Sequence, residues 1–387
     1  MKDGGLKSKI HGRLPKKVQE YLLAIYAHFM RRKTPLRLIK DRYSQRRAIE
    51  KLRPDTKRLI VFLSPGFDVV SGGILSINSL YKETQKLRDL HDSEVIMCNC
   101  LGEPPLIRYS GFKNTDILYN FFDVITYFKK LEFLMIHIPE YHLHSFVEDF
   151  KKIEPKLVKI RNIHFNILLQ NIDALPYTAK QDINLLKNRG KVTAMTAHEA
   201  YTTKQLSEKL GIPLHYFRGW NDAFMYNKRT FDEKKDIMIV SPDVHPQKEK
   251  ILDKIRKSFP SIKIVVIKNM NYEEYKELIS WAKWAVTFGE GLDGYFTETI
   301  FSGGISFAVY NDRFFTEDFK KLRTVYKDYY EMEKKICDDI RELSARDKYV
   351  DYQAQQYNIK IRHNSYQEYL MLLKLFYQGV YTIDLSH

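Results

Sequence analysis

From Leu59 onward, short apolar runs alternate with amphipathic stretches of helical length. The runs predict strands at Leu59–Leu63, Val95–Cys98, Phe133–His137, Asn166–Gln170 and Val192–Thr196, with helices such as Ile74–Lys86 and Lys204–Leu210. This alternation is typical of an α/β domain built on a parallel sheet. The periodicity lapses around Arg218–Arg229 and then resumes. The sequence therefore predicts a first doubly wound domain over residues 59–220.

A second series of the same kind follows the lapse. It predicts strands at Ile237–Val240, Ile262–Ile267 and Trp284–Thr287, helices at Lys248–Ser258 and Tyr272–Trp281, and a further helix opening near Thr297. These elements form a second domain over residues 221–365, and we expect a C-terminal helix and tail, residues 366–387, to pack back on the first domain. Two Rossmann-like halves would face a cleft, with ligands at the carboxyl ends of the strands.

The first 58 residues differ from the rest in charge. They hold 18 Lys and Arg against 5 Asp and Glu, which is +13 of the +15 carried by all 387 residues. Val18–Met30 has an apolar side and is followed by Arg31-Arg32-Lys33, and Leu36–Leu52 is a second basic stretch with interspersed apolar residues. This composition indicates an amphipathic helical extension that binds an anionic membrane surface. The alternative is a helical subdomain packed on the body with a solvated basic face.

Several classes of protein are not favoured. No recognition module for nucleic acid accompanies the basic charge, so no nucleic acid partner is expected. The three cysteines have no zinc-finger spacing, which argues for a reducing compartment and against a structural metal. No signal peptide and no run of about 18 apolar residues is found. We expect a cytoplasmic protein, peripheral on the inner face of the cell membrane.

The strongest candidate chemistry lies in the loop that follows the predicted strand Trp284–Thr287. Two glutamates, Glu290 and Glu298, stand in a Glu-x7-Glu arrangement, the first in a glycine-rich loop and the second in the first turn of a helix. Loop glycines let backbone N–H groups approach an anion, and a helix N-terminus adds partial positive charge. The site residues expected to bind a phosphorylated donor here are Gly291, Leu292, Asp293, Gly294 and Thr297.

The stretch from Asn271 to Gly304 resembles the donor-binding half of retaining GT-B glycosyltransferases, of the family 4-like kind found in bacterial polysaccharide biosynthesis. The resemblance implies that Glu290 contacts the donor sugar and Glu298 binds the ribose hydroxyls of a nucleotide sugar. It covers residues 59–377 in the order of elements, but only the Glu-x7-Glu region is specific. The fold it implies is α/β, GT-B, with the basic helical N-terminal extension outside it.

Other residues fit the resemblance less fully. Gly72 and Gly73 precede a helix, as the family's diphosphate-binding turn does, although a tight turn alone would explain them. Lys248 matches the family's pyrophosphate lysine, or it is an ordinary lysine at a helix start. The family's arginine is missing, and Lys268 is a candidate replacement.

A catalytic histidine is also expected from the resemblance. His137 is the candidate, with Glu140 as a neighbour and His198 as the competitor, and a satisfied histidine at a strand end is the alternative for each. Because no Asp-x-Asp motif is present, transfer is expected to need no metal and no cofactor besides the donor.

The reading that unites these features is a retaining glycosyltransferase. It would move a sugar from a nucleotide sugar to a glycan or lipid-linked glycan acceptor, by same-face attack of the acceptor hydroxyl. Two alternatives remain: a nucleotide-sugar epimerase of the same fold, and a basic protein that binds nucleic acid or anionic lipid without catalysis. The sugar, the base and the acceptor do not follow from the sequence.

Overall fold

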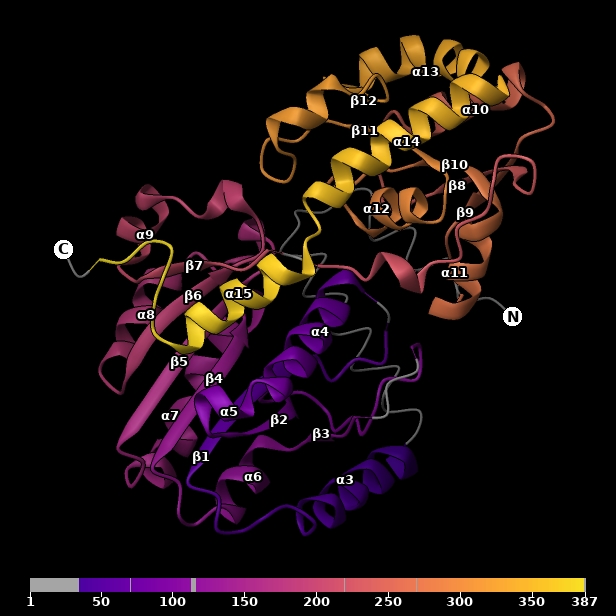
Figure 1. Cartoon of the computed structure of the whole chain (residues 1–387). Coiled ribbons are helices and arrows are strands. Elements are labelled where there is room, and N and C mark those ends of the chain that lie inside the picture. Colours follow the sequence, from indigo (N-terminus) through magenta and orange to yellow (C-terminus); the bar gives the residue numbers. More distant parts are fainter. Residues whose placement is uncertain (1–34, 70, 113–115, 219, 269, 386–387) are drawn as a thin grey trace.

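The computed structural model describes residues 35–69, 71–112, 116–218, 220–268 and 270–385. These residues form two α/β domains, with the first 34 residues, the larger part of the predicted extension, outside the described part (Figure 1). Each domain has one parallel sheet with helices on both faces, as the alternating sequence pattern predicts.

The N-terminal domain has a seven-stranded sheet in the order β3-β2-β1-β4-β5-β6-β7, and every pairing in it is parallel. The chain order reverses between β1 and β4, where a crevice opens at the carboxyl ends of the strands in doubly wound sheets. The strands are β1 (Arg58–Ser64), β2 (Glu94–Asn99), β3 (Leu118–Tyr119), β4 (Phe133–Pro139), β5 (Asn162–Leu169), β6 (Lys191–Thr196) and β7 (Leu214–Tyr216).

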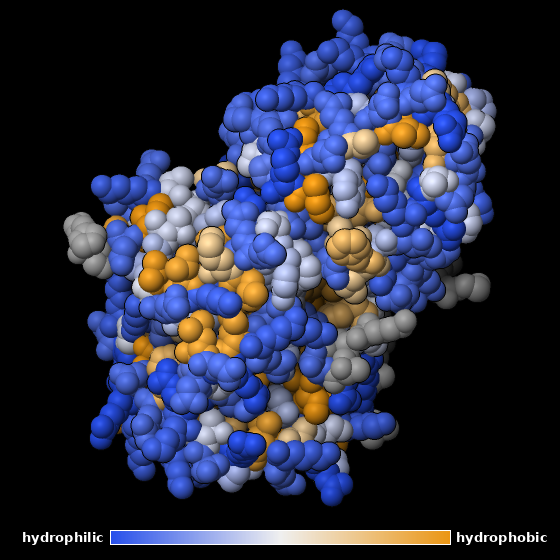
Figure 2. Space-filling view, viewed as in Figure 1, coloured by the Kyte–Doolittle hydropathy of each residue, from blue (hydrophilic) through white to orange (hydrophobic). Residues whose placement is uncertain are grey.

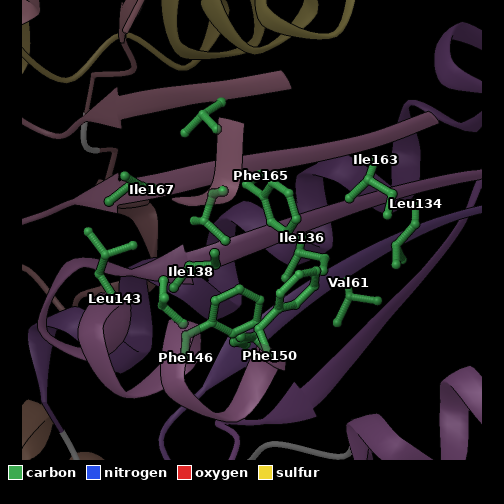
Figure 3. Packing of buried hydrophobic residues seen from close by; sticks show 14 of the residues in the cluster. Val61, Leu134, Ile136, Ile138, Leu143, Phe146, Phe150, Ile163, Phe165 and Ile167 are labelled. Carbon is green, nitrogen blue, oxygen red and sulfur yellow. The ribbon is translucent and has the colours of Figure 1, made fainter. Parts of the chain in front are cut away.

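The central strands of this sheet are apolar at nearly every position because both of their faces are covered. On one face, Phe146 and Phe150 of α7 pack on Ile136 of β4 and Phe165 of β5 (Figure 3). The helices of the domain are α3 (Pro35–Ile49), α4 (Gly72–Lys86), α5 (Arg88–His91), α6 (Phe121–Tyr127), α7 (Leu143–Leu157), α8 (Ala179–Lys187) and α9 (Lys204–Leu210), with short 3-10 turns η1 (Glu140–His142), η2 (Ile172–Ala174) and η3 (Glu199–Tyr201).

The C-terminal domain has a five-stranded parallel sheet in the order β12-β11-β10-β8-β9. Counted from its own first strand this is the order 5-4-3-1-2, so the switch point lies between β8 and β10. Its strands are β8 (Lys235–Val240), β9 (Lys263–Val266), β10 (Ala282–Val286), β11 (Ile305–Val309) and β12 (Val325–Tyr326), and its helices are η4 (Ala223–Met225), α10 (Lys248–Ser258), α11 (Tyr272–Trp281), α12 (Gly294–Phe301), η5 (Glu317–Lys321), α13 (Tyr329–Leu343) and α14 (Arg346–Arg362).

The last helix returns to the N-terminal domain. Helix α15 (Tyr366–Tyr377) leaves the end of α14 and crosses to the first sheet, where Tyr369, Leu373 and Phe376 are buried in its core (Figure 1). The hydrophobic residues visible on this side of the molecule gather mainly around α15 (Figure 2). The chain therefore passes between the domains twice.

Helix α3 packs against the edge of the N-terminal sheet. The side-chain amide of Gln45 is buried and donates to Asn99 Oδ1 at 2.6 Å and to the carbonyl of Leu118 at 2.8 Å, and Ala48 and Ile49 are buried beside it. The described part of the basic extension is thus a helix of the body with an exposed basic face, which is the alternative weighed in the sequence analysis.

The sequence pattern located most elements within a few residues. It placed the strand of residues 166–170 too late, since β5 runs over Asn162–Leu169, and it missed β3, β7, β11 and β12. Helix α12 begins at Gly294, with Asp293 as its N-cap, so Glu298 lies in the second turn of the helix and not in the first as predicted.

The two segments of the chain that pass between the domains are joined by the side chain of one residue. The amide of Asn364, between α14 and α15, accepts from the backbone N–H of Asn221 at 2.9 Å and donates to its carbonyl at 2.6 Å. Because Asn364 is buried, both bonds are protected from water.

We predict that Asn364→Ala lowers the free energy of unfolding by about 1–3 kcal/mol, since two polar backbone groups of Asn221 lose their partner. Urea unfolding measures this change. Asn358→Ala, an exposed site on α14, is the matched control and should change stability little. Equal stability of Asn364→Ala and Asn358→Ala would contradict the role of this clamp.

Candidate active site

The two domains meet through Asn171, which follows β5. Its backbone N–H donates to Glu140 Oε1 at 2.9 Å, and its side-chain amide donates to Glu290 Oε1 at 3.0 Å. Glu140 opens the turn η1 after β4, and Glu290 lies in the loop after β10. Asn171 thus joins a carboxyl group of each domain at the carboxyl ends of the two sheets, where the fold places ligands.

The N-terminus of α4 lies beside this bridge. Ser71 caps the helix by accepting from the N–H of Ile74 at 3.2 Å. A Cβ atom at Gly73 would lie 2.7 Å from Gln170 Oε1, so a larger residue there would displace the side-chain amide of Gln170. Gly72 is exposed and has open space around it. The backbone of this turn can therefore approach an anion in the cleft.

The loop after β10 requires its glycines. Gly291 has a φ of +88°, and a Cβ atom there would lie 2.5 Å from the ring of Phe315. A Cβ atom at Gly289 would lie 2.7 Å from the carboxylate of Asp243. Leu292, half-buried, packs on the hydrophobic clusters of both domains. The backbone path of this loop therefore depends on Gly291, and Leu292 packs it at the domain boundary beside Glu290.

Asp293 fixes the start of α12. Its Oδ1 accepts from the N–H of Phe296 at 2.9 Å, and its Oδ2 accepts from the hydroxyl of Thr287. Burial raises the pKa of Asp293 to about 7. Gly294 begins the helix and Thr297 is buried in its first turn. These residues shape the loop, and the carboxyl group of Asp293 is already engaged as a cap.

Glu298 is only 5% exposed and lies among tyrosines. Its Oε1 accepts from Tyr272 Oη at 3.2 Å, and Tyr272 is linked in turn to Tyr226 by a hydroxyl contact of 3.0 Å. Its Oε2 is buried without a hydrogen-bond partner in the described part of the chain. Burial raises the pKa of Glu298 to about 7, although the hydroxyl groups of the tyrosines oppose the shift.

The cleft is therefore rich in carboxyl groups that are costly to ionise. Burial also raises the pKa of Glu140 to about 7, and the nearby Glu290 adds to the shift. Glu140 Oε2, like Glu298 Oε2, is buried with no hydrogen-bond partner among the residues described. Groups with pKa values raised by burial in a cleft are a feature of functional sites.

The two lysines expected to bind the diphosphate, Lys248 and Lys268, differ in their burial and contacts. Lys248 is buried and donates to the carbonyls of Ser241 at 2.6 Å and Asp243 at 2.8 Å, so it closes the loop after β8. Burial lowers its pKa. Lys268 is exposed after the end of β9. In this structure Lys248 serves the loop, and Lys268 is the one of the two that is open to solvent.

The two candidate histidines lie in different surroundings, and His137 is inside the N-terminal domain. His137 is fully buried in β4, stacked on Phe62 at 4.1 Å, with Asn166 at 2.9 Å from Nδ1 and Tyr377 Oη at 3.2 Å from Nε2. Burial holds its pKa well below the usual range. The structure thus does not bring His137 to the cleft, because its strand position points it under α15 and both ring nitrogens are engaged within the domain.

His198 lies at the domain boundary. Its ring meets Phe314 of the C-terminal domain edge-on at 4.9 Å and Tyr201 at 5.1 Å. Phe314 is buried in the hydrophobic cluster of the N-terminal domain, and its neighbour Arg313 forms an ion pair with Asp173 of η2. This contact, the Arg313–Asp173 ion pair and the Asn171 bridge each join the two domains.

A pocket of about 420 Å³ opens beside the loop of Glu290. Its lining residues, all from the C-terminal domain, are Gly289, Val309, Tyr310, Asn311, Asp312, Lys320 and Tyr329. Glu298 and Lys248 do not line it. Sequence reasoning missed both this pocket and Asn171, because neither has a motif: Asn171 acquires its role only when β5 and the loop after β10 face each other.

No protein-family model matches the chain, and no curated protein sequence matches it. Solved structures do. Anabaena HepE, solved in complex with UDP-glucose, superposes with a TM-score of 0.51 at 11% identity, over 83% of this chain and 100% of HepE. The trehalose-6-phosphate synthase OtsA has a TM-score of 0.51 at 10% identity, over 84% of this chain and 98% of OtsA.

This chain has the GT-B fold. The identity is too low for the likeness to show more than the fold. Within that fold, the segment after β5 contacts both candidate regions: Asn171 donates to Glu290, and the neighbouring Gln170 donates to the carbonyl of Gly73 at 3.2 Å.

We predict that Glu298→Gln is stabilised relative to the wild type as pH rises. The wild-type carboxyl group, with its pKa raised from 4.5 to about 7, keeps a proton in the folded state that the unfolded chain releases, so stability falls between these pH values. Glutamine carries no such cost. The unfolding free energy of Glu298→Gln minus that of the wild type should increase by up to about 3 kcal/mol between pH 4.5 and 7.5.

Urea unfolding across this pH range measures the difference. The control is Glu208→Gln, which removes an exposed carboxylate on α9 and should show no such trend. If the difference in unfolding free energy between Glu298→Gln and the wild type does not change with pH, burial does not hold a proton on Glu298.

Proposed function

We propose that this protein transfers a glycosyl group from a nucleoside diphosphate sugar to a glycan acceptor, with retention of anomeric configuration. The observation that carries the proposal is the placement of Glu290. It lies in a glycine-dependent loop at the carboxyl end of β10, and Asn171 holds it from the opposite domain at 3.0 Å. The GT-B fold shared with HepE, which was solved with UDP-glucose, supports a donor of this class.

Glu298 is the proposed ribose ligand. One carboxylate oxygen accepts from Tyr272, and the other is buried with no hydrogen-bond partner among the described residues. Two vicinal hydroxyl groups are donors that such an oxygen can accept. Glu290, eight positions earlier in the chain, would then contact the sugar itself.

The diphosphate would lie against the N-terminus of α4 and the loop that leads into α12. Gly72 and Gly73 leave the first N–H groups of a 15-residue helix open to an anion. Of the two lysines expected at the diphosphate, Lys268 is the one left to pair with it, since Lys248 is bonded to backbone carbonyls. Protons on Glu140 and Asp293, whose pKa values are about 7, would limit repulsion between the cleft and the donor.

In the proposed reaction the bond between the anomeric carbon and the diphosphate oxygen breaks as the acceptor oxygen bonds to the same face of that carbon. The acceptor proton passes to the leaving phosphate oxygen. Preorganised N–H groups stabilise the charge that develops on the leaving group. We propose that this needs no Mg²⁺ or Mn²⁺ on the diphosphate, so adding either ion should not raise turnover.

The alternative enzyme, a nucleotide-sugar epimerase, would turn over the donor without any acceptor. The non-catalytic alternative would bind anionic polymers or lipids with steep salt dependence and no affinity for nucleotide sugars. Donor binding, tested below, separates transfer from the non-catalytic alternative, and donor turnover without an acceptor separates it from the epimerase.

We further propose that the acceptor is held at an anionic membrane surface that the basic extension binds. On α3, Ile39 is 66% exposed and Tyr43 is 60% exposed, and Lys40 and Arg47 are exposed among them. Apolar side chains between basic ones on an exposed helix face suit the interface of an anionic bilayer. No helix within the described residues is long and apolar enough to cross a membrane.

We predict that a panel of UDP-, GDP-, ADP- and dTDP-sugars includes at least one that stabilises the protein by about 2.7 kcal/mol at 100 times its Kd. With that donor, Glu298→Ala should weaken binding about 10- to 100-fold, because ribose hydroxyls lose a charged acceptor. Glu290→Gln should instead lower turnover about 100-fold, with a smaller effect on binding.

Glu208→Gln is the matched control and should leave both quantities unchanged. The anomeric configuration of the product, read by NMR, tests retention. Absence of stabilisation by every nucleotide sugar would overturn the proposed function, and donor loss without acceptor would favour the epimerase.

We predict that the full chain binds vesicles containing phosphatidylserine and not neutral vesicles, and that high salt weakens this binding. Ile39→Ser with Tyr43→Ser, and separately deletion of residues 2–34, should reduce the bound fraction. The deletion stops before α3 because Gln45, Ala48 and Ile49 belong to the core. Tyr177→Ser, at another highly exposed tyrosine, is the control. Unchanged sedimentation of both test variants would refute the membrane proposal.

A further inference from the structure

Three side chains with metal-binding atoms converge in the N-terminal domain, outside the residues assigned above. Cys100 follows β2, Glu103 lies three residues later, and His142 ends η1 after β4. A ligand atom of each lies within 4.8 Å of the other two. Cys100 and His142 are both buried, and Glu103 is half-buried.

The chain between Cys100 and Glu103 is a turn that brings these two side chains together. The N–H of Glu103 donates to the carbonyl of Cys100 at 3.2 Å, and Gly102, the third residue of the turn, has a φ of +74°. A type II turn requires such a φ at that position, and glycine supplies it without strain. A Cβ atom at Gly102 would also lie 2.7 Å from Asp149 Oδ2.

The neighbouring strands hold this turn in place. The N–H of Cys100 donates to the carbonyl of Ser64 at the end of β1 at 2.9 Å. Glu103 Oε2 accepts from the N–H of Gly66, which orients the carboxylate. Cys100 Sγ lies 3.5 Å from the hydroxyl of Tyr141. Contacts from the chain after β1 and after β4 thus already hold the turn that carries Cys100 and Glu103.

His142 is the observation that points to a ligand. Its side chain is only 4% exposed, and its Nε2 is buried with no hydrogen-bond partner in the described part of the chain. A buried polar atom without a partner costs free energy comparable to a lost hydrogen bond, so native proteins rarely leave one. A metal ion bound to this nitrogen would satisfy it.

We propose that Cys100, Glu103 and His142 bind a Zn²⁺ ion. A set of one thiolate, one imidazole and one carboxylate suits this ion, which accepts sulfur, nitrogen and oxygen ligands with tetrahedral geometry. Bond lengths of about 2.0–2.3 Å would draw the ligand atoms to about 3–4 Å from one another. The thiol of Cys100 releases its proton to solvent on binding. Three protein ligands leave a fourth position for water.

The ion would join the loop after β2 to η1. Because η1 also carries Glu140, whose carboxyl group accepts from Asn171, it would hold rigid the segment on which the domain bridge depends. The sequence gives no sign of this site, because its ligands come from two loops that meet only in the folded sheet. The site stands independently of glycosyl transfer.

The test uses tag-free full-length protein equilibrated with ZnCl₂ and freed of excess metal, with zinc measured by mass spectrometry. We expect one equivalent in the wild type and in Cys337→Ala, a buried cysteine of the other domain. Cys100→Ser and His142→Gln should each lose it. Zn²⁺ should also raise the Tm of the wild type and not of these variants.

Replacement of zinc by Co²⁺ gives a second measurement that needs no variant. A thiolate-to-cobalt charge-transfer band in the wild-type spectrum would support ligation by cysteine. Absence of that band, or less than a tenth of an equivalent of zinc in folded wild-type protein, would overturn the proposal. Zinc retained by folded Cys100→Ser would overturn it as well, since the metal would then be bound elsewhere.

Discussion

The amide of Asn171 is the contact on which the arrangement of the site depends. Its backbone bonds to a carboxyl group of its own domain, and its side chain bonds to Glu290 of the other, so the two sheet edges meet at one residue. At Gly73 the absence of a side chain leaves room for the amide of Gln170, the neighbour of Asn171. In the C-terminal domain, Gly291 lets the loop that carries Glu290 adopt a positive φ beside the ring of Phe315. The two glycines therefore leave room for the loops that carry the Asn171–Glu290 contact.

The sequence predicted the fold well because the information about parallel α/β domains is local. Buried strands are continuous apolar runs and amphipathic helices separate them, so the ends of α9, α10 and α11 agree with the pattern to the residue. Short edge strands such as β3 and β12, of two residues each, leave too little pattern to recognise. Gln45 shows a second limit. A polar residue in a basic stretch is expected to be exposed to solvent. Gln45 is instead buried, because Asn99 and Leu118 supply hydrogen-bond partners from distant parts of the chain.

The candidate site was less predictable, for the same physical reason. Glu290 and Glu298 could be singled out because their spacing along the chain is a motif. Asn171 and the unpaired nitrogen of His142 could not, since their surroundings arise only from tertiary packing. His137 illustrates the converse: a histidine near a strand end resembles a catalytic group in the sequence, but strand alternation directs it under α15, where Asn166 and Tyr377 occupy its nitrogens.

Burial of carboxyl groups connects stability to function in this cleft. Glu140, Asp293 and Glu298 each have a pKa near 7, so their burial is least costly when these groups hold protons. A bound molecule that donates hydroxyl groups to these oxygens would favour their charged forms, whereas one that brings phosphate charge would favour the protons. A ligand with hydroxyl groups at one end and phosphates at the other can do both at once, provided that the hydroxyl groups face Glu298 and the phosphates lie toward the N-terminus of α4. Under the proposed function, these carboxyl groups and the open helix N-terminus at Gly72 would therefore favour one orientation of a nucleotide sugar in the cleft.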